Sequence, residues 1–197
     1  MRCVGPPSAL FSLTLFFGVF WGVHGAFVNH TIDDTKGRLV QYLPTVPKGT
    51  TPPWEDQTTC AGCADVPDAS LSFENTWSAA LYTSDIGSIS ATMKFSGTAI
   101  YVFFILPNFI AGSGLASDVR CNFFIDSEAA GSYSHQSDNS GAFAYNTLVY
   151  KNVTVPDGDH VLLIETTGSD PAVIIFDYAI YTYVLPAHLW NLLNPQK

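Results

Sequence analysis

The chain has 197 residues, a formal net charge of −9, 47% hydrophobic residues and only 13% charged residues. Its length suits one domain with a substantial core and is short for two. The acidic balance argues against nucleic acid and anionic membranes as partners, since no basic stripe is present to release counterions from phosphates.

The first segment, residues 1–25, has the pattern of a secretory signal peptide. Arg2 gives a positive start, residues 9–23 form an apolar run, and Val23 and Gly25 are small enough for the −3 and −1 positions of a cleavage site. We therefore expect cleavage after Gly25 and a secreted, extracellular protein. An uncleaved membrane anchor is the alternative, but the run is short for a membrane span and no stop-transfer pattern follows.

The folded domain is expected over residues 26–185, followed by a tail at 186–197 that forms one helical turn or packs as coil. A first strand is expected at residues 27–32. Residues 44–70 hold five prolines and surround Trp54. Because proline cannot donate to a sheet ladder, we expect a long irregular connection there, packed with the tail over the outside of the sheets.

From Leu71 onward, apolar and polar residues alternate with a period of two, which is typical of strands with one wet face. Residues 98–106 are instead apolar on both faces and predict a central strand, entered through a hairpin turn at Ser96-Gly97. A second turn is expected at residues 129–131. Further strands are expected at 73–77, 88–95, 119–126, near Tyr133, and at 145–151, 160–166 and 172–184. These nine or so strands predict an all-β fold, an antiparallel β-sandwich of the jelly-roll type.

Five motifs stand out along the chain: T-I-D-D-T (31–35), C-A-G-C (60–63) after Trp54, F-E-N-T-W (73–77), F-S-G-T-A-I-Y-V-F-F (95–104) and F-D-Y-A-I-Y (176–181). Together they resemble a family of uncharacterised secreted and membrane-anchored fungal proteins. The resemblance covers nearly all of residues 26–197 and implies a galactose-binding-like jelly-roll ectodomain. Many members continue into a Ser/Thr-rich stalk and a transmembrane helix, whereas no transmembrane anchor is expected in this chain.

Asp177 interrupts a strand that is apolar on both sides. A buried carboxylate must be hydrogen-bonded, paired or bound to a metal, and hydrogen bonding is the simplest expectation. The resemblance implies an alternative, since related jelly rolls often hold a structural calcium between early and late strands. Asp33 and Asp34 would then join Asp177 as oxygen ligands. No other cofactor is expected.

Cys60 and Cys63 form a C-x-x-C motif. A redox-active C-x-x-C motif lies at a helix N-terminus in a βαβ unit. A zinc site needs a second cysteine pair or histidines at ligand spacing. Neither pattern is present in this sequence. In a secreted chain we expect a structural Cys60–Cys63 disulfide, with Cys121 as a buried thiol on an apolar strand face. The alternative is that Cys121 bonds Cys60 or Cys63.

Two sequons predict N-glycosylation at Asn29 and Asn152. The first would place Asn29 and Thr31 on the solvent face of the first strand. The second lies just before a Pro-Asp-Gly turn, so both sites are expected to be accessible.

Tyr133 and Tyr145 flank a loop of small polar residues. Aromatic rings beside hydrogen-bonding groups suit a sugar, so these tyrosines, with help from Trp54, predict non-catalytic binding of a glycan such as a cell-wall polysaccharide. No enzyme is expected, because the histidines are scattered and no nucleophile–base pair is recognisable. A structural or interaction ectodomain without a small ligand is the alternative, and a glycoside-active enzyme is a third.

Overall fold

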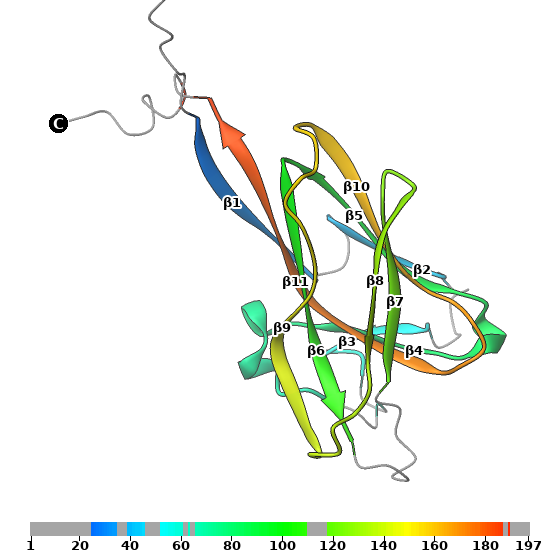
Figure 1. Cartoon of the computed structure of the whole chain (residues 1–197). Coiled ribbons are helices and arrows are strands. Elements are labelled where there is room, and N and C mark those ends of the chain that lie inside the picture. Colours follow the sequence, from blue (N-terminus) through cyan, green and yellow to red (C-terminus); the bar gives the residue numbers. More distant parts are fainter. Residues whose placement is uncertain are drawn as a thin grey trace, which may run out of the picture.

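The computed structural model describes residues 25–34, 39–45, 52–60, 63, 66–109, 118–186 and 189. The expected signal peptide, except Gly25, lies outside the described residues, as do most of the expected tail and parts of the proline-rich connection. The described residues fold as two antiparallel sheets that pack face to face (Figure 1). The predicted antiparallel β-sandwich is thereby confirmed.

The first sheet has six strands in the order β3-β4-β11-β6-β9, with β1 also paired to β11. Its strands are β1 Ala26–Asp33, β3 Trp54–Asp56, β4 Ser78–Tyr82, β6 Ala99–Asn108, β9 Ala142–Asn152 and β11 Ala172–Leu185. The second sheet has the order β2-β5-β10-β7-β8. Its strands are β2 Val40–Leu43, β5 Ile89–Ser96, β7 Val119–Ile125, β8 Glu128–His135 and β10 Asp159–Thr166. Three short 3₁₀ helices complete the described elements, η1 Ala69–Leu71, η2 Phe73–Asn75 and η3 Ser84–Ile86.

Strand β6 lies between β11 and β9, as predicted for an interior strand. Its two faces are not equally covered. Val102 and Phe104 are fully buried between the sheets, whereas Tyr101 and Phe103 are half-buried on the outer face. Branched and aromatic residues favour this half-covered pleated surface, so the apolar run reflects aromatic packing on the outside as well as the core.

The predicted hairpin at Ser96-Gly97 is wrong. Strand β5 belongs to the second sheet and β6 to the first, so this turn carries the chain across the sandwich. The Gly97 N–H donates to the Gly158 carbonyl at 2.9 Å, and the Thr98 N–H donates to the Thr182 carbonyl at 2.7 Å. A Cβ on Gly97 would collide with the Thr182 carbonyl oxygen, so the crossing requires glycine at this close approach of two backbones.

The predicted strand at 73–77 is also wrong, because these residues form η2 and an extended link, and β4 begins at Ser78. Glu74 has φ 52° and Asn75 has φ 63°, and two successive left-handed residues cannot continue a strand. The Phe73 N–H is taken by the Asp177 carboxylate at 2.9 Å, which fixes the turn against β11.

The turn expected at residues 129–131 lies earlier, at Asp126 and Ser127, which have φ 52° and 72°. Residues 129–131 belong to β8 and pair with β7. Aspartate is one of the residues that adopt the left-handed conformation most readily. The Asp126 carboxylate also fixes this turn to β10, because it accepts the Val161 N–H at 2.9 Å. The described residues hold eleven strands, and three of them, the short β2, β3 and β4, were not predicted.

Strand β11 connects most of the first sheet. Its first half pairs with β4 and its second half with β1, so both strands lie along the same edge, one after the other. The pairing with β6 shifts register between Phe176 and Tyr178, which leaves Asp177 as a bulged residue. The pairing of β11 with β6 continues to Thr182, and past this residue the end of β11 and the start of β1 extend away from the rest of the sandwich as a two-stranded ribbon (Figure 1).

Within the part of the chain described by the structure, no helix has the length and apolar character needed to span a membrane.

Candidate functional site

The three aromatic residues predicted to bind sugar, Trp54, Tyr133 and Tyr145, are only partly at the surface. Trp54 is 3% exposed, its ring packs on Tyr42 at a centroid distance of 4.6 Å, and its Nε1–H donates to the Leu43 carbonyl at 3.0 Å. A buried ring offers no face to a ligand, so the prediction that Trp54 helps to bind sugar is wrong. The ring anchors the proline-rich connection through the short edge strand β3.

Tyr133 and Tyr145 are half-buried on β8 and β9, the edge strands of the two sheets. Burial raises the pKa of both phenols. The Tyr145 hydroxyl accepts a hydrogen bond from the Asp68 N–H at 2.8 Å, so the end of the proline-rich connection lies against β9, as expected for a packed cover.

The polar loop between these tyrosines bonds mainly to itself and to the end of β6. The Asn108 side-chain oxygen accepts hydrogen bonds from His135 Nε2 at 2.8 Å and from the Asp138 N–H at 3.1 Å. Ser137 donates to the Phe109 carbonyl at 2.6 Å, and Asp138 accepts the Ser140 N–H at 2.8 Å. The polar side chains that were predicted to bind sugar hydroxyls therefore form hydrogen bonds that stabilise the loop.

The structure places a second set of rings at the opposite end of the sandwich. Phe95 at the end of β5, His160 at the start of β10 and Tyr181 on β11 line a cavity of about 480 Å³, together with Lys94, Ser96, Asp159 and Val161. Ring centroids are 5.3 Å apart for Phe95 and His160, and 6.2 Å apart for Phe95 and Tyr181. We call this site the aromatic corner.

The paired strands β1 and β11 form one side of the aromatic corner. His30 on β1 pairs with Tyr181 in the strand register, and their rings stack at 5.5 Å. His30 also packs on Tyr183 at 5.2 Å. The ribbon extends past the second sheet (Figure 1), so the aromatic corner is only half covered. Tyr181 therefore remains partly exposed.

His160 is fixed by hydrogen bonds at both ring nitrogens. Nδ1 lies 2.7 Å from Asp126 Oδ2, and Nε2 lies 2.7 Å from the Pro156 carbonyl. A carbonyl and a carboxylate both accept, so these two contacts favour the protonated ring, which donates from both nitrogens. Burial acts to lower the pKa of His160, but the bonds to Asp126 and Pro156 raise it above its ordinary value. With both nitrogens engaged, His160 is a wall of the cavity and not a free base.

Sequence reasoning missed the aromatic corner because its rings come from four strands. Residues 30, 95, 160 and 181 are far apart in the chain, and each looked like an ordinary member of an alternating strand. The only local signal was the pair of opposite charges and a hydroxyl at the ends of two strands, Lys94, Ser96 and Asp159.

The three aspartates of the calcium hypothesis meet where β1 ends and β4 begins beside the β11 bulge. Asp34 and Asp177 are 1% and 0% exposed. Asp34 accepts from the Ser78 hydroxyl at 2.7 Å, and Asp33 accepts from the Thr76 hydroxyl at 3.1 Å. Burial raises the pKa of Asp34 and of Asp177 to about 6.

One oxygen of Asp34 and one of Asp177 have no hydrogen-bond partner among the described residues. Carboxylate oxygens of this kind suit a hard cation. The described residues nevertheless contain a single group whose three ligand atoms all lie within 4.8 Å of one another, and it is not this one. Hydrogen bonding of Asp177, the simpler expectation, is confirmed by its bond to Phe73, and calcium stays a prediction.

The cysteines follow the main prediction. Cys60 and Cys63 form a disulfide with a Cα–Cα distance of 5.1 Å, and Cys121 is a buried free thiol whose pKa is raised to about 12 by burial. Asn29 is exposed on β1, and its side-chain oxygen accepts from the Thr182 hydroxyl at 2.7 Å. Asn152 is half-buried at the end of β9. N-glycosylation at both sites stays a prediction.

The sequence matches no family model and no curated protein. Among solved structures, the fold is similar to the Agl-KA catalytic domain, with a TM-score of 0.46, 13% identity, and coverage of 87% of this chain and 30% of that one. It is also similar to a Paenibacillus sp. cycloisomaltooligosaccharide glucanotransferase complexed with cycloisomaltoheptaose, with a TM-score of 0.42, 11% identity, and coverage of 80% and 19%.

A third similar structure is the salicylyl-acyltransferase SsfX3 from a tetracycline biosynthetic pathway, with a TM-score of 0.36, 10% identity, and coverage of 80% of this chain and 41% of that one. The chain spans less than half the length of each of these three proteins.

Proposed function

We propose that the protein is a secreted domain that binds carbohydrate without catalysis and holds the ligand in the aromatic corner. The observation that carries this proposal is the cavity at the aromatic corner, which is lined by aromatic residues together with the polar residues Lys94, Ser96 and Asp159. Its volume falls within the range of small-molecule sites, which are mainly apolar with a few polar groups that fix orientation.

The chemistry of the lining matches the two sides of a sugar. The half-buried ring of Tyr181 provides apolar surface for the C–H groups of a pyranose, and the buried Phe95 ring supports it from below. Lys94 donates hydrogen bonds, Asp159 accepts them, and Ser96 does both, so each can bind a hydroxyl. These three side chains lie at the exposed ends of β5 and β10, where a ligand can reach them.

The lining also argues for binding over hydrolysis. Glycoside hydrolysis uses two carboxyl groups that flank the scissile bond. The lining of the cavity contains one acid, Asp159, and its histidine is engaged at both nitrogens. A domain with this site would hold a glycan, such as a cell-wall polysaccharide, and leave it unchanged.

A glycan array followed by calorimetry with the retained sugar tests the proposal. Tyr181→Ala removes the half-exposed ring, and we expect binding to weaken by about tenfold or more, since a buried aromatic contact contributes on the order of 1–3 kcal/mol. Tyr101→Ala is the matched control, because Tyr101 is a half-buried tyrosine on the outer face of the same sheet, beside Ile180.

The originally predicted loop is tested in the same series by Tyr133→Ala and Tyr145→Ala. If these variants lose binding while Tyr181→Ala retains it, the ligand lies at the loop and not at the aromatic corner. If the wild-type protein retains no glycan, the carbohydrate proposal is wrong and a structural or interaction ectodomain becomes the better description.

A further inference from the structure

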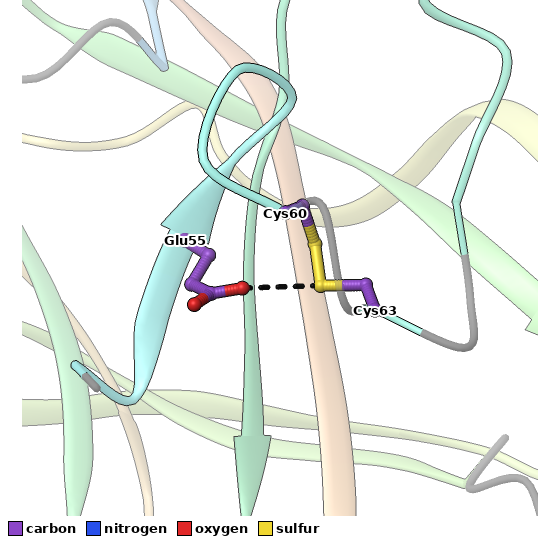
Figure 2. Close-up of side chains that lie close together, drawn as sticks. All are labelled: Glu55, Cys60 and Cys63. Carbon is purple, nitrogen blue, oxygen red and sulfur yellow. Dashed lines mark hydrogen bonds between the residues drawn. A yellow bond between two sulfur atoms is a disulfide. The ribbon is translucent and has the colours of Figure 1, made fainter.

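Beside the disulfide lies a carboxylate that the C-x-x-C motif did not reveal. Glu55 on β3 places Oε2 3.2 Å from the Sγ of Cys63. Figure 2 shows the Glu55 carboxylate directed at this sulfur, which is joined to the Cys60 sulfur by the disulfide. One ligand atom from each of these three residues lies within 4.8 Å of the others, the only group of metal-binding side chains this close among the described residues.

The contact between Glu55 and Cys63 fits the reduced cysteines better than the disulfide. A disulfide sulfur carries no proton and cannot donate to a carboxylate, whereas a Cys63 thiol at this distance can. Two thiolates and one carboxylate would carry three negative charges in a half-buried place, and such a cluster needs a cation.

Backbone hydrogen bonds hold the three residues in addition to the sulfur–sulfur bond. The Cys63 N–H donates to the Cys60 carbonyl at 3.1 Å, which closes the turn of the motif. The Cys60 N–H donates to the Asp56 carbonyl at 3.0 Å, directly after Glu55 on β3. Strand β3 is in turn paired to β4. We expect these contacts to keep the ligands together after the disulfide is reduced.

We propose that reduction of the Cys60–Cys63 disulfide creates a binding site for a thiophilic divalent cation of the Zn²⁺ type, with Glu55, Cys60 and Cys63 as ligands. In the reduction, a dithiol gives two electrons and two protons to the two sulfurs and is itself oxidised to a disulfide. Binding of Zn²⁺ then displaces the two thiol protons to solvent, and the sulfurs bind as thiolates. Two sulfurs and one oxygen leave one position of a tetrahedral zinc site open to water.

The site is accessible from one side. Cys60 is 5% exposed, but Cys63 and Glu55 are only half-buried, so an ion can approach past the carboxylate. Cys121 does not compete, because it is 4% exposed in the core on β7.

Metal titration tests the proposal, and where residues 1–25 are retained, a Cys3→Ser background removes the fourth cysteine. The disulfide is reduced with a phosphine, which takes its oxygen from water while the two protons of that water go to the sulfurs, and the phosphine is then removed without air. We expect the reduced protein to bind one Zn²⁺ per chain with release of protons, and to give a thiolate-to-metal charge-transfer band with Co²⁺. The oxidised protein should show neither.

Variants assign the ligands. Glu55→Gln should raise the Kd for Zn²⁺ at least about tenfold, since even an outer-shell partner contributes that much to affinity. Glu128→Gln, an exposed glutamate at the start of β8, should leave it unchanged. A Cys60→Ser/Cys63→Ser protein should show no charge-transfer band.

Several results would overturn the proposal. One is a reduced, folded protein that binds no Zn²⁺, and another is a Glu55→Gln variant with wild-type affinity. Loss of the β-sheet circular dichroism on reduction would also overturn it, because the proposal requires the fold to hold Glu55 beside the two thiols.

Discussion

Asp34 and Asp177 carry a pH dependence that can be measured. Their pKa is about 6 in the folded protein, mainly because burial disfavours the ionised form, against 3.8 for an ordinary aspartate. The folded state therefore binds more protons than the unfolded chain between about pH 4 and pH 6. Linkage then requires these two groups to lower the stability of the fold as the pH rises through that window.

Replacing Asp177 with asparagine should remove part of this dependence. The amide oxygen can still accept the Phe73 N–H, but no charge is buried above pH 6. The free energy of unfolding of Asp177→Asn, relative to wild type, should therefore increase by about 1–3 kcal/mol between pH 4 and pH 7.5. Urea unfolding at several pH values measures this, with Asp159→Asn as an exposed control, and parallel curves would contradict it.

The calcium hypothesis for the same residues makes a separate prediction. A cation bound to Asp34 and Asp177 would neutralise them without protons, so excess calcium should raise the Tm of the wild-type protein at pH 7.5 by mass action. Asp177→Asn should lose most of that increase. An unchanged Tm on addition of calcium would contradict the calcium hypothesis. The buried carboxylates would then be stabilised by hydrogen bonds alone.

The crossing from β5 to β6 depends on the absence of a side chain at one position. In Gly97→Ala the new methyl group meets the Thr182 carbonyl, which is rigid backbone of β11 and cannot rotate away. Either the turn or β11 must shift, and we expect a loss of about 1–3 kcal/mol of stability, as in overpacked cores. Thermal unfolding measures the effect, and Ser96→Ala, one residue earlier and exposed, is the control. A wild-type Tm for Gly97→Ala would show that the two backbones can separate easily.

The alternation of apolar and polar residues was enough to predict most strands. It could not distinguish a hairpin from a crossing at Ser96-Gly97, because the turn residues are the same and only the partners of β5 and β6 differ. It failed at Glu74 and Asn75, whose left-handed backbone follows Phe73, a residue bonded through its N–H to the distant Asp177. The local pattern therefore predicted most of the strands, whereas contacts between distant segments determine which strands pair and where the turns lie.

The same limit explains why the candidate sites were only partly found. Tyr133 and Tyr145 were chosen because a polar loop adjoins them in sequence, but that loop is bonded internally. Tyr181 and Phe95 meet only when β5 and β11 face each other across the sandwich. Glu55 lies five residues before Cys60, and its place beside Cys63 depends on the turn after β3.

The position of β11 in the first sheet constrains how the molecule can form during synthesis. Strands β1, β4 and β6 all pair with β11, and β11 is the last of the strands that the structure describes. While the chain emerges from the ribosome with its N-terminus first, β1 has no partner and the sheet lacks its central member until about residue 185 has appeared. The first sheet can therefore be completed only at the end of synthesis, after the strands of the second sheet have all been made.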